Sequence, residues 1–98
     1  QPHLYTRTRD FYREFADALS LLDEVILTEI YPARETPIPG VTSELILDNL
    51  RPGSAGRLIR KADVLDVVRQ TDFDVLMTLG AGDLEDYSGE IAKVVETL

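Results

Sequence analysis

Three segments of this 98-residue chain hold the residues whose types could do chemistry. The first contains its one histidine, His3, together with Arg7 and Arg9. An imidazole can donate a hydrogen bond to an anion, and a guanidinium can bind a carboxylate or phosphate through two parallel hydrogen bonds. These residues predict an anion-binding site, and the alternative is a solvated start of a helix without a functional role.

The second segment, Tyr31–Gly40, holds three of the five prolines. Prolines remove backbone donors and favour extended or turn geometry, so neither a helix nor a central strand runs through this segment. Its Arg34 and Glu35 could clamp a substrate or could form an ordinary surface ion pair.

The third segment begins with Gly80, Ala81 and Gly82, where the backbone could approach a ligand closely and donate amides to a carboxylate. The run lacks the spacing of a dinucleotide-binding fingerprint, and a structural turn is the alternative. A valine at position 82 would damage the loop if Gly82 had a positive φ. The acids at 83, 85 and 86 could coordinate a divalent ion, but they lack regular ligand spacing and also suit a solvated face.

Composition excludes several classes of function. Eighteen Asp and Glu against ten Lys and Arg give a net charge of −8, which disfavours nucleic acids and anionic membranes as partners. The absence of cysteine excludes disulfides and thiolate catalysis and fits a reducing compartment. The chain has neither a Gly-rich loop ending in Lys-Ser/Thr nor a nucleophile motif. It also lacks an apolar run of membrane-spanning length, signal-peptide features and an initiator Met, so we expect a piece of a longer protein.

The elements that must position these segments follow from apolar spacing. We expect a helix over 8–22, capped by Thr6 or Thr8, with Asp10 in its first turn. Its buried face is expected to carry Phe11, Phe15, Ala18, Leu19 and Leu22. A buried strand over 25–30 follows. Thr42 or Ser43 then caps a helix that carries residues 45–47 and Leu50 and stops before Arg51.

The second half continues the alternation. We expect a short strand over 57–60, a helix over 63–70 for which a strand is the competitor, and a second buried strand over 74–79. A last helix opens at Ser88 and buries Ile91, Val94, Val95 and Leu98. This order predicts one α/β domain over 1–98, Rossmann-like, with a mostly parallel sheet flanked by helices. Ligands of such sheets bind beyond the carboxyl ends of the strands, where the three segments fall.

Three runs together resemble one protein family: residues 1–10 (QPHLYTRTRD), residues 31–40 (YPARETPIPG) and residues 80–83 (GAGD). The chain is similar over essentially its whole length to the C-terminal domain of the Mur ligases, the ATP-dependent enzymes of bacterial peptidoglycan synthesis, and above all to those that add L-alanine. Many members have an Arg directly after the His, where this chain has Leu4.

The resemblance implies a three-domain cytoplasmic enzyme in which this domain closes over a UDP-sugar domain and a central ATPase domain. ATP would phosphorylate the carboxylate of UDP-N-acetylmuramate, and the amine of L-alanine would attack the acyl phosphate. ATP and Mg²⁺ would be bound elsewhere in the parent enzyme, so the isolated domain would bind no metal and be inactive. The first strand of the domain is expected to precede Gln1.

The resemblance also assigns site residues. His3 and Arg7 would face the reacting carboxylate and the incoming amino acid, and Arg9 continues the basic pattern. Gly80, Ala81, Gly82 and Asp83 would form a weaker contact with the amino-acid substrate. Two alternatives stay open: the related ligase that attaches recovered murein tripeptide to the same UDP-sugar, and a non-catalytic α/β binding module.

Overall fold

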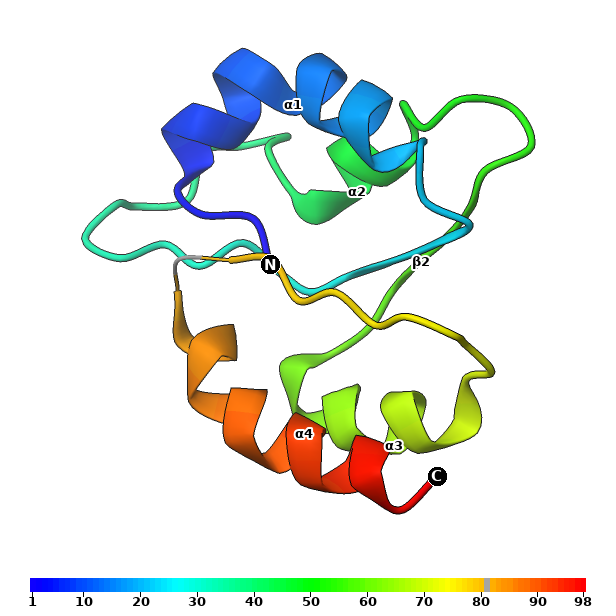
Figure 1. The fold of residues 1–98 in the computed structure, drawn as a ribbon. Helices are drawn as coiled ribbons and strands as arrows, with labels where there is room; N and C mark the ends of the chain where they lie inside the picture. Colours follow the sequence, from blue (N-terminus) through cyan, green and yellow to red (C-terminus); the bar gives the residue numbers. More distant parts are fainter. Residues whose placement is uncertain (81) are drawn as a thin grey trace.

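Two layers of helices enclose a short parallel sheet in the computed structural model, which describes residues 1–80 and 82–98 (Figure 1). Helices α1 (Tyr5–Leu19) and α2 (Ser43–Leu47) lie on one side, and α3 (Val64–Gln70) and α4 (Ser88–Glu96) lie on the other. Between them, β1 (Glu24–Leu27) pairs in parallel with β2 (Ala55–Leu58). Two 3₁₀ helices, η1 (Lys61–Asp63) and η2 (Asp83–Tyr87), precede α3 and α4. The expected Rossmann-like α/β class is confirmed.

Helix α1 begins earlier than its sequence suggests. It starts at Tyr5 with Leu4 as its N-cap residue, so both threonines lie inside the helix and neither caps it. Thr8 is instead buried inside the helix, where its hydroxyl donates to the carbonyl of Leu4 at 3.0 Å. Asp10 therefore lies beyond the first turn, and the expectation that it complements the helix dipole is wrong.

The buried face of α1 is also turned from the expected one. Ala16 has no exposed surface and packs in a core with Val25, Leu27 and Ile46, to which Tyr12 and Leu19 add partly buried contacts. Phe11 and Phe15 are 50% and 36% exposed. Ala16 is small enough to let α1 approach α2 and β1 closely, so its side of the helix faces the core and the phenylalanines do not.

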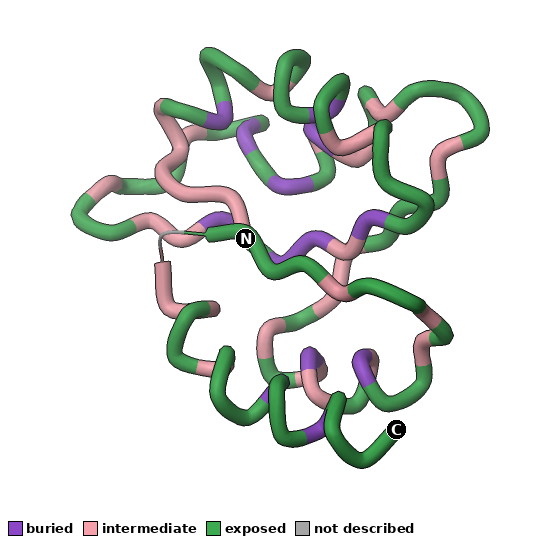
Figure 2. Tube along the Cα trace, in the orientation of Figure 1, coloured by how far each residue is buried: buried purple, intermediate pink, exposed green. Residues whose placement is uncertain are grey.

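A second core lies under the other helix layer. Val64 and Val68 of α3 pack against Ile91 and Val94 of α4, so residues 64–70 form the expected helix and not the competing strand. Val95 and Leu98, expected on the same face, are 37% and 64% exposed. Figure 2 shows the buried residues on the inward sides of both helix layers and along β1. Among the described residues, no helix has the length and apolar character needed to cross a membrane.

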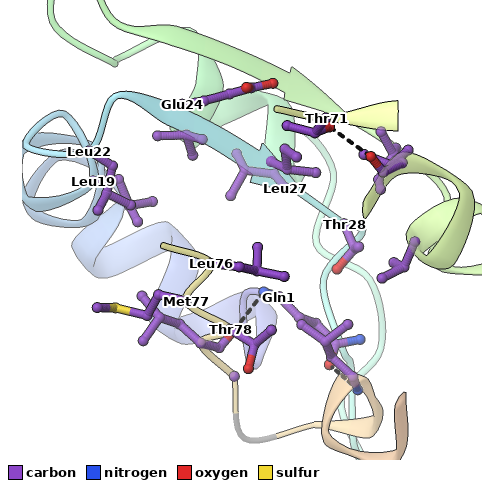
Figure 3. Close-up of a pocket in the computed structure, with 18 of the residues that line it drawn as sticks. Gln1, Leu19, Leu22, Glu24, Leu27, Thr28, Thr71, Leu76, Met77 and Thr78 are labelled. Carbon is purple, nitrogen blue, oxygen red and sulfur yellow. Dashed lines mark hydrogen bonds between the residues drawn. The ribbon is translucent and has the colours of Figure 1, made fainter. Parts of the chain in front are cut away.

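The segment 74–79 is not a strand. It runs through the middle of the molecule (Figure 1) without strand pairing to any described residue, and Val75, Met77 and Leu79 are 80%, 61% and 52% exposed. A cavity of about 940 Å³ is lined by this segment, by β1 and by helices of both layers (Figure 3). An extended segment becomes a strand only by pairing with a neighbouring backbone, and no described residue pairs with this segment.

Candidate anion site at the carboxyl end of the sheet

The segment around His3 is fixed by the chain that follows β1. The N–H of Tyr31 donates to the carbonyl of Pro2 at 2.8 Å, and the N–H of Leu4 donates to the carbonyl of Tyr31 at 2.9 Å. His3 and Tyr31 thus form a parallel bridge, and their rings stack with centroids 5.7 Å apart. This pairing places the histidine at the carboxyl end of β1, as the sequence predicts.

Leu4 turns the chain into α1 through a left-handed conformation, with φ at 69°. A non-glycine residue adopts this φ at a cost, and it does so where surrounding contacts fix it. Both backbone groups of Leu4 form hydrogen bonds. Its N–H donates to the carbonyl of Tyr31, and its carbonyl accepts from the N–H and the hydroxyl of Thr8. The turn therefore sets how the first turn of α1 leaves the sheet.

Glu35 of the proline-rich segment caps α1 from outside the helix. Its carboxylate accepts a hydrogen bond from the Thr6 hydroxyl at 2.5 Å and another from the Thr6 N–H at 3.1 Å. The first N–H groups of a helix have no partners within it, and a negative charge complements the helix dipole there. Glu35 therefore forms no ion pair with Arg34 among the described residues, and a role of this segment as a substrate clamp stays a prediction.

The hydrogen bond from the Thr6 hydroxyl lowers the pKa of Glu35 below its ordinary value of 4.5, against the opposing effect of desolvation. The backbone N–H groups of Thr6 and Tyr5 and the charge of Arg9 lower this pKa further. Because the folded-state pKa is the lower one, the contact stabilises the fold above pH 4.5 and this stabilisation is lost as the pH falls through the folded-state pKa.

Arg7 and Arg9 have different surroundings. Arg7 is exposed, lines the cavity together with His3, and forms no ion pair with residues 1–80 or 82–98. Arg9 bonds Asp10 through its Nε at 2.9 Å on the exposed side of the helix. Of these two arginines, Arg7 is therefore the one whose charge is available to an anion.

Gln1 joins the His3 segment to the third predicted segment. Its backbone nitrogen donates to the carbonyl of Leu79 at 2.9 Å, its side-chain amide donates to Asp83 at 2.6 Å, and its side-chain oxygen accepts from the N–H of Leu84 at 2.9 Å. Asp83 also pairs with Lys61, and the hydrogen bonds from Lys61 and then Gln1 hold the pKa of Asp83 below its ordinary value. Asp83 thus connects three parts of the site.

Gly82 fits between these segments because it has no side chain. A Cβ there would lie 2.5 Å from Cγ of Tyr31 and 2.7 Å from Oε1 of Gln1. The φ of Gly82 is −99°, so the expectation of a positive φ is wrong. Position 82 requires glycine because the neighbouring side chains approach its backbone closely. Gly80 is less confined, because a Cβ there would lie 3.3 Å from its nearest atom, the carbonyl oxygen of Gln1. Ala81 lies outside the described residues.

The structure therefore brings all three predicted segments together, while the binding role of their residues stays a prediction. It adds three residues to which sequence reasoning assigned no role of their own, Gln1, Tyr31 and Lys61, and it gives Glu35, a predicted clamp, a contact with Thr6. Tyr31 and Glu35 belong to the proline-rich segment that the sequence predicts to lie near the site, whereas no sequence pattern predicts a role for Lys61. Within residues 1–80 and 82–98, no group of three or more His, Asp or Glu is arranged to hold a metal ion.

No protein-family profile matches the chain. It is 65% identical to the UDP-N-acetylmuramate–L-alanine ligase of Phocaeicola vulgatus, over 97% of this chain and 21% of that protein. It is 50% identical to the ligase of the same name from Porphyromonas gingivalis, over 100% and 22%, and 47% identical to that of Cytophaga hutchinsonii, over 98% and 20%. The chain spans about one fifth of the length of these relatives and is homologous to a domain-sized part of them.

The packing around Gly82 generates a matched pair of predictions. Gly82→Ala should lower the free energy of unfolding by about 1–3 kcal/mol, because the new methyl group must displace the Tyr31 ring. Gly89→Ala in α4, where a Cβ meets no atom within 4 Å, should instead raise it by up to about 1 kcal/mol. Thermal or denaturant unfolding measures both, and equal effects would contradict the close approach.

Proposed function

We propose that this chain is the C-terminal domain of a UDP-N-acetylmuramate–L-alanine ligase, closing over the UDP-sugar and ATPase domains of the same protein. The observation that carries the proposal is the 65% identity over 97% of the chain to a ligase of that name. The arrangement of His3 and Arg7 at one end of the sheet supports it, because this is where ligands of such folds bind.

The proposed reaction develops negative charge that this domain can stabilise. ATP and Mg²⁺ would bind the central domain and turn the muramate carboxylate into an acyl phosphate, which the amine of L-alanine then attacks. A tetrahedral intermediate and a leaving phosphate need positioned cations and hydrogen-bond donors. Arg7 supplies a positive charge without an ion-pair partner among the described residues, and His3 supplies a ring donor held against Tyr31. We place this reaction in the cytoplasm, as part of the same proposal.

The direct test measures phosphate release by the complete parent protein with ATP, Mg²⁺ and UDP-N-acetylmuramate. L-alanine should stimulate release, and murein tripeptide should not. Stimulation by tripeptide alone would identify the recycling ligase instead. Failure of both to stimulate release would leave a fold without this activity.

Arg7→Ala in the parent protein should lower the rate of L-alanine-dependent phosphate release more than tenfold, or about 1.4 kcal/mol in the barrier. The control is Arg13→Ala, which removes the same charge from the same helix at a residue that lies over the Tyr12 ring and does not line the cavity. An unchanged rate for the Arg7 variant would contradict its role as an anion clamp.

We also propose that a further strand, leading into Gln1, occupies the cavity between β1 and segment 74–79. The carbonyl of Leu27 accepts a hydrogen bond from the N–H of Ile59, just beyond β2, so the backbone groups of Leu27 face β2. Successive residues of a strand direct their backbone groups to opposite edges, so those of Ile26 face the cavity. The hydroxyl of Thr28, also in the lining, is buried without a partner among the described residues. The backbone nitrogen of Gln1 donates a hydrogen bond to the carbonyl of Leu79. A strand that leads into Gln1 would therefore pass between the edge of β1 and segment 74–79.

Met77 and Leu98 test this strand because they are 61% and 64% exposed and only Met77 lines the cavity. In the 98-residue chain, Met77→Asp and Leu98→Asp should each change the free energy of unfolding by no more than about 0.5 kcal/mol. In the parent protein, Met77→Asp should cost about 2 kcal/mol or more, because the strand would bury an unpaired charge. A small effect of Met77→Asp in both proteins would contradict the strand.

A further inference from the structure

We propose that Glu35 is a positioning residue, which holds the first turn of α1 so that Arg7 faces the anion of the reaction. The inference deepens the proposed function and rests on it. Glu35 lies 29 positions from Thr6 in the chain, and its two carboxylate oxygens bond the hydroxyl and the N–H of that one residue. Thr6 directly precedes Arg7, so this contact fixes the backbone from which the arginine extends.

No side chain at the N-cap position or acidic residue in the first turn of α1 holds this turn among the described residues. The first turn of α1 contains no acidic residue, and its N-cap residue, Leu4, offers no side-chain cap. Leu4 has a left-handed φ of 69°, a conformation that persists only where neighbouring contacts fix it. The bonds of Leu4 and Tyr31 fix the turn on the sheet side, and Glu35 fixes it on the helix side.

The charge of Glu35 is directed to the helix end and not to the cavity. Its hydrogen bonds go to Thr6, and Arg9 is the cation whose charge acts on it. Arg7 and His3 line the cavity, whereas Glu35 does not. The carboxylate can therefore order the first turn of α1 without occupying the place of an anionic ligand beside Arg7.

The experiment is a double-mutant cycle on the kcat of L-alanine-dependent phosphate release in the parent protein. Glu35→Gln should lower kcat about fivefold or more in the wild-type background. In the Arg7→Ala background it should lower kcat by less than about twofold, because a residue that acts only through Arg7 has nothing left to position. Glu14→Gln, on the exposed side of α1, is the matched control and should leave kcat unchanged in both backgrounds.

Equal losses in the two backgrounds, or no loss in either, would overturn the inference. Thr6→Val removes the hydroxyl donor and keeps the N–H, so the same cycle with this variant decides the question if Glu35→Gln fails to fold. Amide exchange at Thr6 provides a readout without activity and should be faster in Glu35→Gln than in Glu14→Gln. If the wild-type protein releases no phosphate with L-alanine, the proposed function fails first and this inference falls with it.

Discussion

The backbone pairing between Pro2–Leu4 and Tyr31 is the constraint on which the candidate site depends. Two hydrogen bonds, at 2.8 and 2.9 Å, hold the chain before α1 against the chain after β1. Through this pairing the His3 ring reaches Tyr31, and Tyr31 in turn leaves room only for a glycine at position 82. One short stretch of parallel pairing therefore brings together segments that lie far apart in the sequence.

The architecture around this pairing consists of two separate cores joined by a thin sheet. The core of α1, α2 and β1 is distinct from the core of α3 and α4, and the cavity of about 940 Å³ reaches both. Because β2 is the one strand among the described residues that pairs with β1, the other edge of β1 faces this cavity. Gln1, His3 and Arg7 line this cavity, so the site and both cores share it.

The sequence predicts the elements that depend on local pattern and fails where distant contacts decide. Apolar spacing identifies α3 and α4, and the turn residues place the three segments at the carboxyl end of the sheet. No local pattern reveals that Glu35 caps α1, because the partners are 29 positions apart and the carboxylate replaces the threonine caps that the sequence offers. The apolar run 74–79 has the composition of a strand, but composition does not supply the neighbour that a strand requires.

Amide hydrogen exchange at Leu4 and Tyr31 tests most directly whether the His3 segment is held in place before any ligand arrives. Both N–H groups donate within the pairing. We expect both to exchange at least about tenfold more slowly than the same residues in an unstructured peptide. Exchange at the peptide rate would mean that the segment is loose in the free protein, and it would contradict a preformed anion site at the carboxyl end of the sheet.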